Sequence, residues 1–324
     1  MTAVLARSRR RVLPLPGSLG AYAVRRLGLG VAQILVVAVV VFLLTDRLSG
    51  DAAVVIAGDD PDPAVIAALR TELGLDRPVW ERLGAWLGGA LTGDLGTSLI
   101  TGRAVTAVIA DGLPVTLLLA ALTLVVLVPL SLALGMLAAR REGGTADRVV
   151  TATTIGLYSL PEFALGVVLV TVFAVQLGWL PPTGIGVAEP AVFVLPIVVL
   201  LARPVCSLSR LVRAGLVDAL AADHVAHARR LGFSPRAVLW RHALPGAVTP
   251  AVQQLARTTD WLIGGVVVVE AVFVLPGLGT ALVDTITARD VPVVAGLALV
   301  LATGTVLLNL GADLLARVLT PVAS

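Results

Sequence analysis

The chain has 324 residues, of which 57% are hydrophobic and only 14% are charged. Because soluble domains carry about 25% charged residues, this composition excludes a soluble globular protein and predicts an all-α integral membrane protein. The formal net charge is +3, and the arginine and lysine total of 24 consists of arginine alone. A single cysteine, Cys206, excludes an internal disulfide.

The N-terminal region predicts a retained membrane anchor. Residues 1–26 hold six arginines, and the apolar run 27–45 then offers about 19 residues, enough to cross about 30 Å of hydrocarbon at 1.5 Å per residue. A cleaved signal peptide would instead have a short apolar core and a small-residue cleavage site. We therefore expect a cytoplasmic tail at 1–26 and the first transmembrane helix at 27–45.

Residues 46–112 are predicted to form an external helical segment. Two short amphipathic helices are expected in it, each started by an aspartate cap and a proline at the first helical position. These residues are Asp62 with Pro63 and Asp76 with Pro78, and Gly74 ends the first helix. Trp80 and Trp86 suit a membrane interface.

Five further apolar runs each reach the length of a spanning helix. They are 113–139, 149–175, 191–212, 246–273 and 293–316. With the N-terminus in the cytoplasm, 17 arginines fall on that side and six on the other, with Arg257 inside a span. The excess of arginine predicts cytoplasmic N- and C-termini, the latter at 317–324. The core 113–316 would then hold five spans and a cytoplasmic loop at 213–245.

That loop predicts a stiff helical hairpin. A helix is expected over 216–231, with Gly232 in the left-handed position past its end. Ser234 can cap a second helix that starts at Pro235 and runs to about Leu244. A surface helix held to anionic lipid by arginines is one interpretation, and a docking surface for a partner protein is the other.

The sequence gives no sign of covalent chemistry. A phosphate-binding loop of the Walker type needs a lysine, which this chain lacks. His224 and His227 are three residues apart on a helix, but no cysteine or carboxylate pattern completes a metal site. We therefore expect no catalytic residue, no metal ligand and no bound cofactor in this chain, and no nucleic-acid partner.

Charged residues inside the predicted spans are candidates for the translocation pathway. Arg257 and Asp260 are three residues apart on one helix face and can pair. Inserting each ionised group at mid-membrane costs about 2.5–3.5 kcal/mol of free energy. The two residues are therefore expected either to form a structural ion pair against a neighbouring helix or to line a polar path. Glu270 and Glu162 are further candidates for such a path.

The hairpin sequence "DHVAHARRLGFSPRAVLWRHAL" resembles the cytoplasmic loop of permeases from bacterial binding-protein-dependent ABC importers, whose general motif is E-A-A-x-x-x-G-x₉-I-x-L-P. Ala228, Gly232, Leu244 and Pro245 match this motif. The departures are Ala226, His227 and His242, and they look like the dipeptide/oligopeptide branch. The stretches "LRTELGLDRP", "GDLGTSLITGRAV", "LGWLPPTG" and "VVVEAVFVLPGLG" are similar to that branch too, so the resemblance covers nearly the whole chain.

The resemblance implies a permease that forms half of the pathway for di- or oligopeptides in the bacterial inner membrane. It implies as partners a second related permease, two ATPase subunits or one fused pair, an extracytoplasmic binding protein, the peptide substrate and membrane lipid. ATP and Mg²⁺ would sit on the ATPases. The residues it places against an ATPase are Asp223, Ala228, Arg229, Arg230, Gly232, Phe233, Ser234, Pro235, Arg236, Leu244 and Pro245.

Two alternatives remain open. Nickel complexes, haem, glutathione or oligosaccharides are carried by similar permeases, because binding proteins largely select the cargo. A membrane transporter or scaffold that needs no ATPase is an interpretation from another class, and it leaves the "GFSP" hairpin unexplained. Neighbouring genes for two Walker-motif ATPases and a secreted binding protein would separate these classes.

Overall fold

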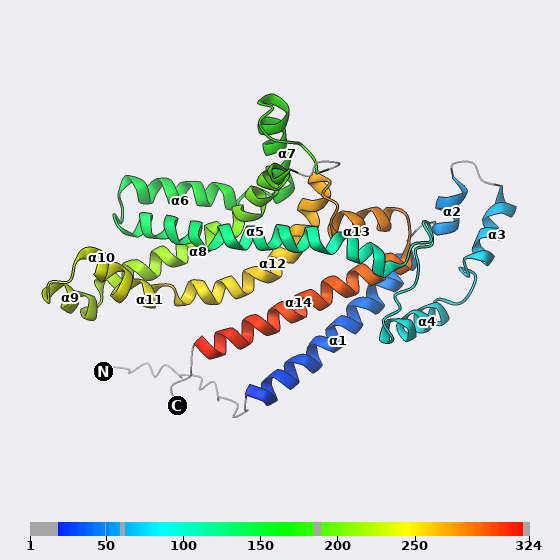
Figure 1. Ribbon diagram of the computed structural model, residues 1–324, viewed down its shortest axis with the longest axis horizontal. Helices are drawn as coiled ribbons and strands as arrows, with labels where there is room; N and C mark the ends of the chain where they lie inside the picture. Colours follow the sequence, from blue (N-terminus) through cyan, green and yellow to red (C-terminus); the bar gives the residue numbers. More distant parts are fainter. Residues whose placement is uncertain (1–18, 49, 59–61, 185–188, 320–324) are drawn as a thin grey trace, which may run out of the picture.

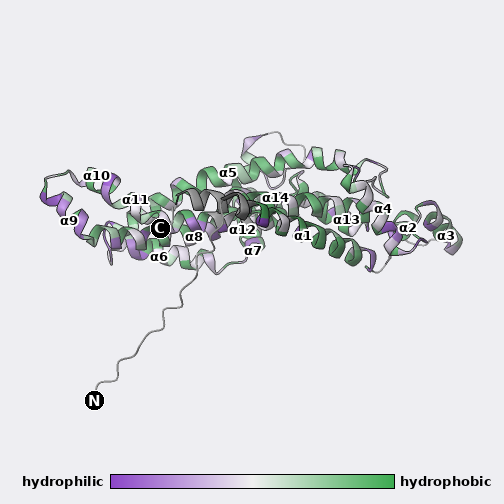
Figure 2. Cartoon of the chain, turned by 90° about the horizontal axis from the view of Figure 1, so that it is seen from below, coloured by the Kyte–Doolittle hydropathy of each residue, from purple (hydrophilic) through white to green (hydrophobic). Residues whose placement is uncertain are grey.

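The computed structural model describes residues 19–48, 50–58, 62–184 and 189–319, and they form an elongated bundle of helices (Figure 1). The middle of the bundle is hydrophobic, and its two ends carry most of the hydrophilic residues (Figure 2). A polypeptide that crosses hydrocarbon must satisfy its backbone groups internally, which helices do. The predicted all-α membrane fold is therefore confirmed.

Within the described residues, four helices are long and apolar enough to cross a membrane. They are α1 (Leu19–Asp46), α5 (Val105–Ala139), α8 (Val194–Ala221) and α14 (Val291–Leu319). Two bent helix pairs pass the same test, which raises the total to six if each pair is one span. All six predicted apolar runs thus have a helical counterpart.

The predicted run 149–175 is wrong as an uninterrupted helix. It divides into α6 (Thr145–Tyr158) and α7 (Glu162–Leu169), with an angle of 106° between them, and a π-helical segment extends α7 to Gln176. Pro161 occupies the position before α7 with extended backbone angles. A proline lacks the N–H and disfavours helix in the preceding residue, so the chain turns here. In Figure 1, α7 projects away from the bundle.

The second bend follows α12 (Thr249–Phe273). Val274 has a left-handed φ of 50°, and α13 (Leu278–Thr287) leaves at 71° to the preceding helix. No helix was predicted over the residues of α13. Pro276, Gly277 and Gly279 signal a break after the predicted run 246–273, but a left-handed valine is rare, so no sequence signal places the corner at Val274.

The core of the bundle lies where α5 packs on α8 and α12 crosses α8, while α1 pairs with α14. Leu119, Leu200, Leu262 and Phe273 are buried together in the centre. Closer to the hairpin, the second apolar cluster includes Leu127, Leu208, Leu216, Leu244 and Ala247. A side chain at Gly135 would meet Val212 at 2.6 Å, so glycine lets α5 approach α8 closely.

The external segment folds into α2 (Ala52–Ala57), α3 (Pro63–Glu72) and α4 (Val79–Leu91). Asp62 accepts a hydrogen bond from the Ala64 N–H, and Gly74 has a φ of 65°, as predicted. The predicted Asp76 cap is wrong, because Pro78 occupies the position before α4 and no side chain caps it.

Trp86 joins α4 to the bundle. Its side chain is buried against Phe42 of α1, and its indole N–H donates to the Leu95 carbonyl at 3.2 Å. Arg82 pairs with Asp46 at the end of α1. Trp86 is therefore a packing residue, whereas Trp80 is 71% exposed as an interface residue would be.

Candidate functional site

The hairpin forms one end of the bundle and begins at a break in α8 (Figure 1). Ala222 is extended, so α8 stops at Ala221 and a separate helix, α9 (Asp223–Arg230), follows. The predicted continuous helix over 216–231 is therefore wrong. Val225 and Ala228 of α9 are buried against the rest of the hairpin.

The turn after α9 is closed by backbone hydrogen bonds. The Gly232 N–H donates to the Arg229 carbonyl at 3.0 Å, and the Phe233 N–H donates to the Ala228 carbonyl at 3.3 Å. This is the Schellman arrangement, which requires a left-handed residue. Gly232 has a φ of 82°, as predicted.

The second arm of the hairpin starts at Ser234. Its hydroxyl accepts a hydrogen bond from the Ala237 N–H at 3.3 Å, and Pro235 is the first helical residue, so both predictions are confirmed. The arm continues through α10 (Pro235–Ala237), a π-helical turn (Val238–Ala243) and α11 (Leu244–Ala247). With both ends of the turn capped, the hairpin has little freedom to flex.

Side-chain contacts tie the two arms together. Val225, Ala228, Val238 and Ala243 form a small buried cluster. The Phe233 and His242 rings lie 5.2 Å apart, and the His224 Nε2–H donates to the His242 carbonyl at 3.2 Å. Ala228 and Leu244, both expected at an ATPase, are buried inside this chain and support the hairpin from within.

The outer surface of the hairpin combines arginines with large apolar side chains. The remaining expected docking residues are exposed: Asp223, Arg229, Arg230, Gly232, Phe233, Ser234, Pro235, Arg236 and Pro245. Leu231 and Trp240 are also exposed, at 65% and 55%. Neither residue is among the predicted docking residues. Large apolar side chains on an otherwise charged, exposed hairpin are typical of the centre of a protein interface.

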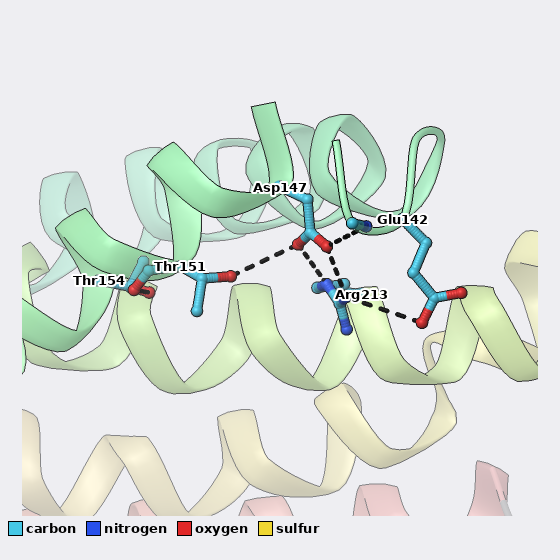
Figure 3. A network of polar contacts seen from close by, with 6 residues as sticks. Glu142, Asp147, Thr151, Thr154 and Arg213 are labelled. Carbon is cyan, nitrogen blue, oxygen red and sulfur yellow. Dashed lines mark hydrogen bonds and ion pairs between the residues drawn. The ribbon is translucent and has the colours of Figure 1, made fainter. Parts of the chain in front are cut away.

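An ion-pair network fixes the α5–α6 turn to α8, at the same end of the bundle as the hairpin (Figure 3). Arg213 of α8 donates to both carboxylate oxygens of Asp147, at 2.5 and 2.6 Å. The Gly143 N–H donates to the same carboxylate at 2.9 Å, and Glu142 lies 3.8 Å from Arg213. Neither Asp147 nor Arg213 is among the predicted site residues.

A polar stripe on α8 contains Arg203, Ser207 and Arg210, which share one helix face. Arg203 lies nine residues, about 14 Å, inside the start of α8. Arg203 and Arg210 are among the 17 arginines expected on the cytoplasmic side, and both lie within the predicted run 191–212 and within the apolar span Pro190–Ala221. Their side of the membrane stays a prediction. Glu162 at the start of α7 lies 3.6 Å from the Arg203 Nε.

Glu270 is fully buried at the corner between α12 and α13. Its carboxylate accepts a hydrogen bond from the Gly279 N–H at 2.6 Å and packs directly on Gly277. The Leu278 N–H donates to Thr116 Oγ1 at 2.9 Å, which ties the same corner to α5. Glu270 therefore stabilises this corner, and its place in a translocation pathway stays a prediction.

The other predicted pathway residues lie on α12. Arg257 is exposed in the isolated chain, on the helix face that also presents Gln253 and Gly264. The Asp260 side chain lies outside the described part of the structure. The pairing of Arg257 with Asp260 therefore also stays a prediction.

Comparison with known proteins identifies the family. Residues 131–323 match the binding-protein-dependent transport system inner membrane component family, and residues 20–120 match the N-terminal family of the same transport systems. The glutathione transport system permease protein of Escherichia coli strain K12 is 36% identical over 300 residues, which cover 93% of this chain and 97% of that protein. The Salmonella choleraesuis protein of that name is 37% identical over 297 residues, covering 92% and 96%.

These relatives are permease subunits, and the matches extend over the bundle and the hairpin alike. The chain therefore belongs to the family of binding-protein-dependent transport system inner membrane components, the permease subunits of ABC importers.

Proposed function

We propose that this permease carries small peptides, and that its hairpin is the coupling helix that transmits ATPase motion to the spanning helices. In this proposal the chain and a second related permease enclose the pathway, and each docks on an ATPase subunit that binds ATP and Mg²⁺. The N- and C-termini and the hairpin lie in the cytoplasm, and an extracytoplasmic binding protein delivers the substrate to the segment 46–112.

The stiffness of the hairpin is the observation that carries this proposal. A coupling element must move as one body, because a flexible loop would absorb the motion it receives. The Schellman turn at Gly232, the Ser234 cap and the buried cluster around Val225 each oppose flexing. The exposed Phe233 and Trp240 give the hairpin an apolar centre for docking, with arginines around it.

The peptide cargo is supported by the relatives. Glutathione is a tripeptide, and permeases of glutathione transport systems are more than a third identical to this chain over nearly its full length. The arginines of the polar stripe on α8 and Arg257 on α12 also supply cationic partners for the carboxylate of a peptide on its way through an apolar bundle.

The proposal is tested with the reconstituted complex of both permeases, the ATPases and the binding protein. Gly232→Asn and Gly232→Val form a graded pair, because asparagine tolerates the left-handed conformation and a β-branched residue does not. We expect Gly232→Asn to keep most ATP-driven tripeptide uptake. Gly232→Val should lose most uptake per assembled complex and most of the substrate stimulation of ATPase activity.

Full uptake by Gly232→Val would contradict the coupling role. If the wild-type complex takes up neither glutathione nor an ordinary α-linked tripeptide, the proposed peptide cargo is wrong. The coupling role is then tested by the substrate stimulation of ATPase activity alone. Gly178→Val is a matched control, since Gly178 also has a left-handed φ of 64° but lies after the π-helical segment that ends at Gln176, outside the hairpin and outside the Asp147–Arg213 network.

A further inference from the structure

The ring of Tyr158 lies between two guanidinium groups. The Arg203 guanidinium is 5.3 Å from the ring centroid and that of Arg210 is 5.9 Å from it. Tyr158 is the last residue of α6, and both arginines come from α8. A tyrosine ring within about 6 Å stabilises each cation through its π electrons, so the ring holds two like charges near one another.

Positive charge is in excess in this cluster. Glu162 is the one carboxylate that the described residues bring within 4 Å of either arginine, and it lies 3.6 Å from the Arg203 Nε, too far for a good hydrogen bond. The Arg203 Nε is buried without a hydrogen-bond partner in the described structure. Arg210 has no carboxylate within 4 Å among those residues. Of the two guanidinium groups, that of Arg203 alone has a carboxylate nearby among the described residues, and this carboxylate is loosely placed.

The cluster is open on the surface of the isolated chain. The Arg203 side chain is 41% exposed, Tyr158 is 47% exposed and Arg210 is exposed. Most other faces of α8 are buried in the bundle. Exposed arginines in an apolar span are costly against lipid and therefore face water or another protein. Because the pathway lies between two permeases, this face of α8 is the one suited to line it.

We propose that Arg203, Arg210 and Tyr158 form an anion-binding station that receives the carboxylate of the transported solute part-way through the membrane. The proposal rests on the proposed function, since it requires that this face lines the pathway. Arg203 and Arg210 would each donate charge-assisted hydrogen bonds to the carboxylate, and Tyr158 would keep the two guanidinium groups oriented toward it. Glu162 holds Arg203 only weakly, so an incoming anion can compete with it.

The first test uses small thiol reagents and does not depend on the cargo. Ser207 lies one turn from Arg203 and three residues from Arg210, so Ser207→Cys on a Cys206→Ala background reports on the cluster. The complete importer is labelled separately with an anionic and a cationic methanethiosulfonate. The labelling rate with the anionic reagent is divided by that with the cationic reagent, and this ratio is compared among variants. We expect Arg203→Gln and Arg210→Gln each to lower the anionic-to-cationic ratio by about tenfold. Arg148→Gln, which removes an exposed arginine of α6, should leave it unchanged.

The second test is uptake of a tripeptide against the same tripeptide amidated at its C-terminus. For each variant, the uptake rate of the free-acid peptide is divided by that of the amidated peptide, which gives the acid-to-amide ratio. Any preference of the binding protein is common to all variants and cancels when these ratios are compared. Arg203→Gln should lower that ratio by about tenfold, the loss expected for one charge-assisted hydrogen bond, and Arg203→Lys should retain most of it.

Failure of the Ser207→Cys thiol to react with either reagent would overturn the anion station, as would a labelling ratio that neither arginine substitution changes. Equal loss of acid and amide uptake would overturn it as well, because it would assign Arg203 a structural role only. If the wild-type complex carries neither tripeptide, the proposed cargo fails, while the labelling ratio still decides whether the anion station exists.

Discussion

Arg213 donates two hydrogen bonds to Asp147, from Nε to Oδ1 at 2.5 Å and from Nη2 to Oδ2 at 2.6 Å. The pair joins the start of α6 to α8 about two turns before α8 ends at the hairpin. Motion that the hairpin passes on to α8 would therefore reach α6 through a rigid, doubly bonded contact. Bidentate pairs of this kind fix geometry as well as supplying energy.

We predict that Asp147 and Arg213 act as a unit. Asp147→Asn and Arg213→Gln should each lower the apparent melting temperature of the complex and its substrate-stimulated ATPase activity. Arg213→Gln removes the counter-charge of Asp147, and Asp147→Asn leaves Arg213 with only the more distant Glu142. The double variant should lose less than the sum of the two single losses. A double-mutant cycle on melting temperature and ATPase activity measures this. Strictly additive losses would show that the two residues do not cooperate.

The corner between α12 and α13 should tolerate no side chain at Gly279. A Cβ there would lie 2.5 Å from the Val267 Cα and 2.8 Å from Glu270 Oε2. Because a backbone atom cannot move aside, Gly279→Ala should cost about 1–3 kcal/mol, as overpacked cores do. Gly84→Ala in α4 is the control, since nothing lies within 4 Å of that position. Melting of the assembled complex compares the two, and equal stabilities would contradict this account of the corner.

The hairpin's exposed Trp240 should be a principal contact of the ATPase subunit. Buried tryptophans at the centre of an interface cost about 2 kcal/mol or more when they are truncated. We expect Trp240→Ala to weaken ATPase binding by more than about tenfold, measured by titration of the purified permease pair. Trp80→Ala, which removes a tryptophan from the external segment, should leave that affinity unchanged. An unchanged affinity for Trp240→Ala would exclude it from the interface.

Local features of the hairpin and the external segment were predictable from sequence, because caps and turns depend on neighbouring residues. Gly232, Ser234, Pro235 and Asp62 all occupy the positions that their residue types favour. The helical runs themselves followed from length and apolar composition, which a bilayer-spanning helix must satisfy.

Features that depend on tertiary contacts could not be found in this way. From the sequence, Pro161 was compatible with a kink inside one span. The angle of 106° between α6 and α7 depends instead on where α7 packs in the fold. Arg203 lies inside the predicted run 191–212, but the sequence alone does not show which groups surround it. Its place beside Tyr158 and Glu162 depends on the approach of α6 and α7 to α8, which no local pattern records.

The orientation of the bundle can be tested by cysteine labelling on a Cys206→Ala background. Thr101 is exposed in the external segment and Arg236 is exposed on the hairpin. The arginine asymmetry predicts that Thr101→Cys reacts with an impermeant thiol reagent in intact cells, whereas Arg236→Cys reacts only after the membrane is permeabilised. Ser98 in the same external segment is unsuitable, because it is buried and donates to Asp290. The reverse labelling pattern would overturn the orientation.

Arg257 and Asp260 are predicted to pair on the face of α12 that lines the pathway. Their spacing of three residues on a helix motivates the pairing, since a lone charge within a span is costly. Removing one partner of a buried pair costs about 3–5 kcal/mol, whereas replacing both with apolar residues can be nearly neutral. Arg257→Leu and Asp260→Leu alone should therefore impair assembly, and the double variant should restore it. A pathway pair would leave the assembled double variant slow in uptake per complex, and full uptake by that variant would assign the pair a structural role only. Single variants that assemble normally would contradict the pairing itself.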